Sequence, residues 1–177
     1  MNREAGHCVV ATRMSFAVTI GQLWRSLLFY EQIDERPPWY LRLLLPRPIR
    51  TEGEKSAVGD EALCLYEGGH LLKRVTRIDP GHRVEFVVVE QQLEVGAAIQ
   101  LSGGSYALRE IGGGRSELCV TTHYSGGRHP RWAWRAIESA FCHLFHRHLM
   151  RSIGRKAGKS LPPVTASEQQ SSVSFKA

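Results

Sequence analysis

The sequence predicts a single α+β domain in which one long helix packs on an antiparallel sheet. Runs of β-branched and apolar residues between short turns occupy most of the chain from Ala62 to Tyr124, and such short connections join antiparallel strands. A segment of helical periodicity, Pro130 to Lys156, follows them and carries a broad apolar face. Because that face needs an apolar partner, we expect the sheet to grip the helix around a cavity.

The N-terminal part of the chain combines strand and helix patterns. Cys8–Met14 is rich in β-branched residues and predicts a first strand. Apolar residues at helical spacing predict a helix over Ile20–Tyr30, with Thr19 as its N-cap. After a pair of prolines, Trp39–Leu45 predicts a second short helix, and the polar stretch Thr51–Asp60 predicts a loop.

Five further strands are expected before the long helix. They span Ala62–Glu67, Leu71–Ile78, Arg83–Glu90, Ile99–Glu110 and Glu117–Tyr124. Turn residues separate them at Gly68-Gly69, Pro80-Gly81, Val95-Gly96 and Gly112-Gly113-Gly114. The segment after the long helix is rich in Ser, Gln and Pro, which is typical of disorder. We therefore expect one folded domain over residues 7–156, to which the resemblance described below assigns ligand binding, and a disordered tail over residues 157–177.

The long helix places its residues on two distinct faces. His143 and His146 fall on the polar side, where we expect them to be solvated, whereas His148 falls near Phe141 on the apolar side. His148 then needs a partner, either a backbone carbonyl in the core or a polar group at a cavity. Glu138 borders the same face and could pair with a strand arginine or face the cavity with a raised pKa. The apolar face consists of Trp134, Ile137, Phe141, Leu144, Phe145 and Leu149.

Composition narrows the class of protein. The chain has 177 residues, 42% of them hydrophobic, and a net charge of +6. No apolar run is long enough to span a bilayer, and the first residues lack the apolar core of a signal peptide, so we expect a cytoplasmic protein. The four scattered cysteines predict free, largely buried thiols. The oligomeric state cannot be predicted.

Basic residues cluster from Arg147 to Lys159, at the end of the long helix. Cations at a helix C-terminus complement the helix dipole, so no nucleic-acid partner is expected. An alternative is a partner-binding role for this basic end or for the tail, which would make association with nucleic acid or anionic vesicles sensitive to salt.

No sequence motif assigns a catalytic residue, a metal or a cofactor. The helix histidines lack the H-E-x-x-H pattern, and the segment Gly154–Ser160 has glycines one residue too close for a phosphate-binding loop. Ser105 lies within a strand and lacks the final glycine of a nucleophile elbow. Glu67, His70 and Glu90 are acid/base residue types on or beside strands, so an acid/base pair remains chemically possible.

Several short motifs suggest a known family. They are Pro38-Trp39-Tyr40-Leu41-Arg42 with Pro46-Arg47-Pro48, Glu67-Gly68-Gly69-His70 with Arg74-Val75-Thr76, Gly104-Ser105-Tyr106-Ala107-Leu108, Thr121-Thr122-His123-Tyr124, and Pro130-Arg131-Trp132-Ala133-Trp134-Arg135 with His146-Arg147-His148. In these residues the chain resembles the START-like superfamily, also called SRPBCC or the polyketide cyclase/dehydrase and lipid transport group. More narrowly, it is similar to uncharacterised bacterial SRPBCC proteins. The resemblance covers roughly Cys8 to Lys156.

The resemblance implies a helix-grip fold, a curved antiparallel sheet wrapped around the C-terminal helix with an apolar cavity between them. Members of the superfamily variously bind lipids, sterols, hormones or polyketides, and a minority catalyse cyclisation, hydrolysis or hydroxylation. We therefore predict binding or carriage of a small hydrophobic, lipid- or polyketide-like ligand. The alternative is an aromatase/cyclase- or dehydrase-type enzyme that uses His70 or Glu67 as acid/base.

Aromatic side chains with a few polar groups suit an apolar ligand. The candidates for the cavity wall are Trp39, Tyr66, His70, Tyr106, Tyr124, Trp134, Phe141, Phe145 and His148.

Overall fold

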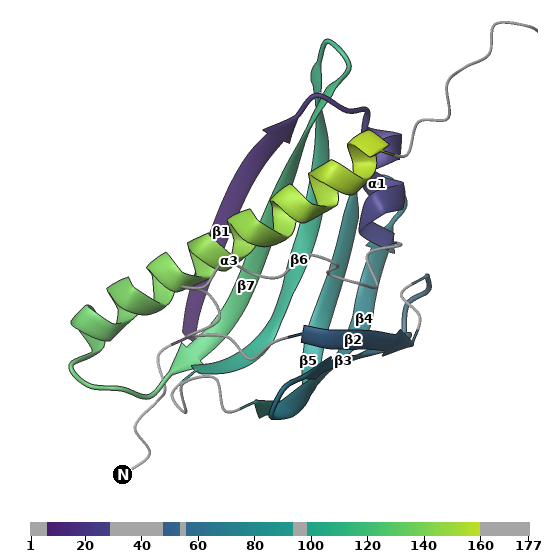
Figure 1. Ribbon diagram of the computed structural model, residues 1–177. Coiled ribbons are helices and arrows are strands. Elements are labelled where there is room, and N and C mark those ends of the chain that lie inside the picture. Colours follow the sequence, from purple (N-terminus) through teal and green to yellow (C-terminus); the bar gives the residue numbers. More distant parts are fainter. Residues whose placement is uncertain (1–6, 29–47, 54–55, 94–98, 160–177) are drawn as a thin grey trace, which may run out of the picture.

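Seven antiparallel strands form one curved sheet, and a long C-terminal helix crosses one face of it (Figure 1). The computed structural model describes residues 7–28, 48–53, 56–93 and 99–159. The elements are β1 (His7–Phe16), α1 (Ile20–Leu28), β2 (Pro48–Gly53), β3 (Glu61–Tyr66), β4 (Gly69–Asp79), β5 (Arg83–Leu93), β6 (Ile99–Gly112), β7 (Arg115–Gly126) and α3 (Arg131–Lys159). The strand order is β1-β7-β6-β5-β4-β3-β2. The predicted α+β helix-grip architecture is confirmed.

The first helix begins where the sequence predicts it. The Thr19 backbone N–H donates to the Gln22 side chain at 2.9 Å, and the Gln22 backbone N–H donates to Thr19 Oγ1 at 3.3 Å. This reciprocal capping box satisfies donors that the first turn leaves without helical partners. Leu23 and Leu27 of α1 are buried in the core. The second predicted helix, Trp39–Leu45, lies outside the described residues.

The sequence prediction misses one strand, β2. The predicted loop Thr51–Asp60 overlaps this strand, in which Thr51 pairs with Cys64 and Gly53 with Ala62 of β3. The segment is polar and has little strand propensity of its own. Pairing with the edge of β3 decides its conformation, because tertiary context overrides local preference in strands.

The other strands match the predicted ones to within a few residues. Between β6 and β7, Gly112, Gly113 and Gly114 all have positive φ angles, of 83°, 63° and 69°. Side chains at such angles are strained, so the glycine run makes this tight turn possible. The turn predicted at Val95-Gly96 lies outside the described residues.

The long helix α3 presents a different face to the sheet from the one the apolar pattern predicts. Ile137 and Leu144 are exposed by 57% and 41%, although both belong to the predicted apolar face. The buried face instead carries Glu138, Cys142, His146, Leu149, Met150, Ser152, Ile153 and Ala157. A helical wheel that selects apolar residues misplaces the buried face of α3. That face includes the polar residues Glu138 and His146, which are buried because they have hydrogen-bond partners.

The main core lies where the C-terminal half of α3 meets α1 and the sheet. Met150, Ile153 and Ala157 are fully buried there. The predicted tail begins inside this helix, because α3 continues to Lys159; the rest of the predicted tail lies outside the described residues. No helix in the described part of the chain is long and apolar enough to cross a membrane.

One glycine of α3 is in close contact with the first strand. A Cβ atom on Gly154 would lie 2.3 Å from Cε1 of the Phe16 ring. Glycine in a helix interior is less favourable than alanine by about 1 kcal/mol. Its presence here is explained by the ring, which occupies the place of a side chain.

We predict that Gly154→Ala destabilises the protein by about 1–2 kcal/mol, because overpacking outweighs the gain in helix propensity. Gly158→Ala is the matched control in the same helix, since a Cβ atom at Gly158 would meet nothing within 4 Å beyond its chain neighbours and the backbone of its own helix. It should leave stability unchanged or raise it. Urea unfolding of the three proteins measures both effects, and a Gly154→Ala variant as stable as Gly158→Ala would contradict the packing argument.

Candidate functional site

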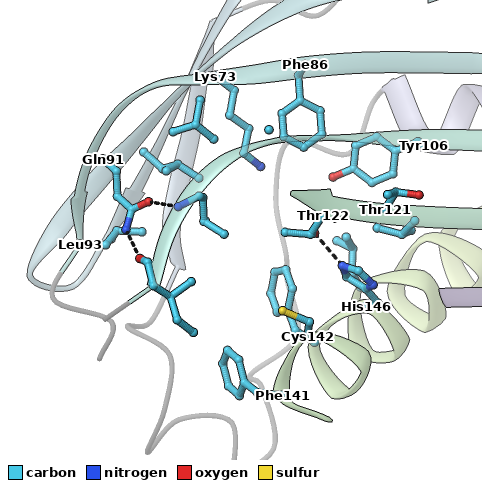
Figure 2. Close-up of a pocket in the computed structure, with 18 of the residues that line it drawn as sticks. Lys73, Phe86, Gln91, Leu93, Tyr106, Thr121, Thr122, Phe141, Cys142 and His146 are labelled. Carbon is cyan, nitrogen blue, oxygen red and sulfur yellow. Dashed lines mark hydrogen bonds between the residues drawn. The ribbon is translucent and has the colours of Figure 1, made fainter. Parts of the chain in front are cut away.

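A cavity of about 110 Å³ lies between α3 and the inner face of the sheet (Figure 2). Residues from β3 through β7 and from the middle of α3 form its wall. Most of that wall is apolar, and its larger apolar side chains include Leu71, Phe86, Leu101, Val120, Phe141 and Phe145. This is the arrangement of a ligand pocket, which is typically concave, apolar and supplied with few polar groups.

The cavity lies beside the point where two strands of the sheet separate. Backbone pairing between β5 and β6 runs only from Arg83↔Ala107 to Val87↔Gly103. Beyond it, the Gln91 amide nitrogen donates to the carbonyl of Ile99 at 2.9 Å, and its oxygen accepts from the N–H of Leu101 at 2.8 Å. The side chain thus satisfies backbone groups that the separated strands cannot pair with each other.

Four of the predicted wall residues lie at the cavity, namely Tyr66, Tyr106, Phe141 and Phe145. Trp39 lies outside the described residues. The remaining four, His70, Tyr124, Trp134 and His148, do not line the cavity.

Each of these four side chains lies away from the cavity, in a position set by the strand or helix that carries it. His70 precedes the inward-facing Leu71 on β4 and contacts Glu90 at 3.1 Å, since neighbouring strand residues face opposite sides. Tyr124 is fully buried in a separate cluster with Cys8, Val10 and Cys142. Trp134 donates its indole N–H to the carbonyl of His129 at 3.1 Å. His148 is half-buried, and burial followed by the charge of Arg151 lowers its pKa. Its buried Nε2 has no hydrogen-bond partner among the described residues, contrary to the expectation that this ring would find one.

His146 is the residue that the sequence interpretation misplaces most clearly. It is only 1% exposed and lies in the cavity wall, not in solvent. Its Nε2 lies 2.7 Å from Thr122 Oγ1 and its Nδ1 lies 2.9 Å from Thr12 Oγ1, so the ring bridges α3 to β7 and β1. His143, also predicted to be solvated, is half-buried and lies 2.7 Å from the same Thr12 oxygen through its Nδ1.

These hydrogen bonds suit a neutral imidazole. Such a ring donates from one nitrogen and accepts at the other, and a threonine hydroxyl can match either role. Burial, with a smaller effect of His143, lowers the pKa of His146 to about 4. The ring is therefore uncharged at neutral pH. Among the described residues, no three His, Cys, Asp or Glu side chains gather closely enough to hold a metal ion.

Glu138 does not face the cavity. Arg131, one residue after Pro130, donates to both of its carboxylate oxygens, at 3.0 and 3.2 Å. The partner is thus an arginine of the same helix and not the strand arginine that we expected as one of two possibilities. A side chain at Gly126 would collide with this ion pair, since its Cβ would lie 2.6 Å from the carboxylate.

Lys73 is another wall residue that sequence reasoning missed. Its Nζ lies 4.8 Å from the centroid of the Phe86 ring, and this ring lies 5.7 Å from that of Tyr106. Within the described part of the wall, Lys73 is the single lysine or arginine. The available signal was strand alternation, because Lys73 shares a face with Leu71 and Val75.

Two further titratable groups of the wall, Tyr66 and Cys142, stay protonated at neutral pH. Burial raises the pKa of Tyr66 to about 12, although the charge of Lys73 acts in the opposite direction. Burial, followed by the charge of Glu138, raises the pKa of the Cys142 thiol to about 11. The described wall therefore contains one lysine, several hydroxyl groups and no carboxylate side chain.

We predict that His146 makes stability fall in acid. Its folded pKa of about 4 lies below the unfolded value near 6.5, so its contribution is complete above about pH 6.5 and is lost as the pH falls toward 4. Between pH 7.5 and 4.5 this amounts to about 2–3 kcal/mol. His146→Gln cannot titrate and should lose less stability than wild type by this amount in urea unfolding. Equal losses in both proteins would exclude His146 as the cause.

Comparison with known proteins gives structural matches only. No protein-family model matches the chain, and no curated protein matches it. The chain is similar to the Zhui aromatase/cyclase from Streptomyces sp. R1128, with 11% identity and a TM-score of 0.65 over 90% of this chain and 99% of that one.

Two other solved structures show the same likeness. One is norcoclaurine synthase from Thalictrum flavum in complex with dopamine and hydroxybenzaldehyde, with 11% identity and a TM-score of 0.62 over 89% of this chain and 90% of that one. The other is a START superfamily protein from Mycobacterium smegmatis, with 9% identity and a TM-score of 0.61 over 86% of this chain and 98% of that one. At such low identity the matches establish the fold alone: the chain has the START-like helix-grip fold.

Proposed function

We propose that the protein binds or carries a small hydrophobic ligand in the cavity between the sheet and α3. The observation that carries this proposal is the cavity itself, whose wall is mostly apolar and is formed by five strands and the long helix. Burial of apolar ligand surface there would contribute roughly 25 cal/mol per Å² to the free energy of binding, before the costs of ordering the ligand are subtracted. We place this role in the cytoplasm.

The volume of the cavity favours a ligand, or an inserted part of a ligand, the size of one aromatic ring. The cavity measures about 110 Å³, and an apolar cavity of about 150 Å³ in another protein binds benzene. The norcoclaurine synthase structure, which holds dopamine and hydroxybenzaldehyde, supports single-ring ligands as a class to test first.

Aromatase/cyclase- or dehydrase-type catalysis has less support, although the Zhui aromatase/cyclase shares the fold. The acid/base residues considered from the sequence, Glu67 and His70, are absent from the cavity wall. His70 instead contacts Glu90. The wall's own Tyr66 and Cys142 have raised pKa values, so neither is poised as a base at neutral pH.

Native mass spectrometry of gently purified protein, together with displacement of a hydrophobic dye, tests the proposal directly. We expect a small apolar molecule to co-purify, or the dye to be bound and then displaced by single-ring compounds such as indole. Absence of both a co-purifying molecule and any binding of dye or indole would overturn the proposal.

We predict that Leu101→Trp weakens indole binding at least about tenfold, because the larger side chain fills the cavity that Leu101 lines. Leu144→Trp is the matched control, since Leu144 lies on α3 with 41% exposure and does not line the cavity. It should bind indole as wild type does. Calorimetric titration of the three proteins, with circular dichroism to verify folding, measures the difference. Equal affinities in all three would place the ligand elsewhere.

A further inference from the structure

The side of α3 that is turned away from the sheet carries one continuous stripe of residues (Figure 1). Steps of three and four residues place them all on one side of the helix. The first half of the stripe is apolar, with Ile137 and Leu144 exposed by 57% and 41%, and the second half is basic. We call it the outer stripe of α3, and it consists of Ala133, Ile137, Ala140, Leu144, Arg147, Arg151 and Arg155.

The excess positive charge of the chain is concentrated on α3. This helix contains five arginines, two lysines and a single carboxylate, Glu138, so its formal charge is +6. The whole chain, with 23 basic and 17 acidic residues, also has a net charge of +6. Without α3, 16 basic and 16 acidic residues remain, and their charges cancel. Any anionic partner is therefore attracted mainly to this helix.

Arginines of the sheet differ from those of the outer stripe in having carboxylate partners. Among the described residues, neither Arg147 nor Arg151 lies within ion-pair distance of a carboxylate. Both side chains are exposed, so their charges face solvent. On the sheet, four ion pairs neutralise the arginines, namely Arg74–Glu61, Arg77–Asp79, Arg83–Glu85 and Arg109–Glu117.

The helix dipole does not explain Arg147 and Arg151. Cations stabilise the C-terminus of a helix, but this effect falls off within the last turn. Because α3 ends at Lys159, Arg151 lies about two turns before the end and Arg147 about three turns. The dipole therefore accounts only for the last residues of the basic cluster, and the other arginines need a different explanation.

We propose that the outer stripe of α3 docks on the surface of a bilayer that contains anionic lipids. The arginines contact lipid phosphates through charge-assisted hydrogen bonds. Ile137 and Leu144 enter the boundary between headgroups and acyl chains, where their exposed apolar surface is removed from water. A nucleic acid would bind the arginines through its phosphates and leave both aliphatic side chains in water. The two halves of the stripe together thus favour a bilayer.

Co-sedimentation with vesicles tests the basic half of the stripe. At low salt, wild type should bind vesicles of equal parts phosphatidylcholine and phosphatidylglycerol at least about tenfold more tightly than vesicles of phosphatidylcholine alone, and added salt should weaken the binding. The double variant Arg147→Gln/Arg151→Gln should bind the anionic vesicles at least about tenfold more weakly than wild type. The matched control Arg74→Gln/Arg83→Gln removes the same number of charges from the sheet and should bind as wild type does. Circular dichroism verifies that both variants fold.

Leu144→Ser tests the apolar half in a protein that keeps all its charges. It should weaken binding to the anionic vesicles at least about threefold, because less apolar surface leaves water on docking. Any binding of a duplex DNA oligonucleotide should be the same in Leu144→Ser and in wild type, since that contact depends on charge.

Three results would overturn this inference. Equal binding of wild type to neutral and anionic vesicles, or binding to neither, would exclude the surface without any variant. Equal losses in the two double variants would assign the binding to overall charge. Tighter binding to the DNA than to the anionic vesicles, with Leu144→Ser unaffected in both, would make a nucleic acid the partner instead. The inference is independent of the cavity, so Arg147→Gln/Arg151→Gln should bind indole as wild type does, and failure of wild type to bind indole would count only against the proposed function.

Discussion

The hydrogen bonds of His146 determine how the long helix sits on the sheet. By contacting Thr122 and Thr12, the ring joins α3 to two neighbouring strands, β7 and β1. Loss of either bond would leave a buried nitrogen of His146 unsatisfied, which costs about 1–3 kcal/mol. The rotation of α3 is thereby restricted, and with it the choice of helix residues that reach the cavity, Phe141, Cys142, Phe145 and Leu149 among them.

The sheet also contributes to the cavity, because two of its strands, β5 and β6, separate beside it. Strands β6 and β7 are paired along their whole length, whereas the pairing of β5 with β6 ends at Val87. Beyond that point the Gln91 side chain bonds the backbone of β6. The two halves of the fold thus have different roles. The end near α1 holds the main core, and the end near Gln91 encloses space. This division explains how a chain of 177 residues can be stable and still leave a cavity.

The architecture could be predicted from the sequence because each element carries its own local signal. Alternation, glycine turns and the Thr19 cap indicate most strand and helix positions. The site could be predicted only in part, because a wheel weighted by apolar residues favours Ile137 and Leu144, while tertiary hydrogen bonds decide that His146 is buried. Lys73 shares a strand face with Leu71 and Val75, which is a local signal of its orientation, but Leu72 on the other face weakens that signal, and pairing with β3 and β5 decides it.

The contact between Gly154 and Phe16 also limits how this sequence can vary. The two positions lie far apart along the chain yet share one volume, so neither can accept a larger side chain while the other stays the same. A smaller residue at position 16 would open space for alanine at position 154, whereas the reverse order of changes passes through a clash. Among descendants of this sequence, the two sites should therefore change together, with the ring lost first.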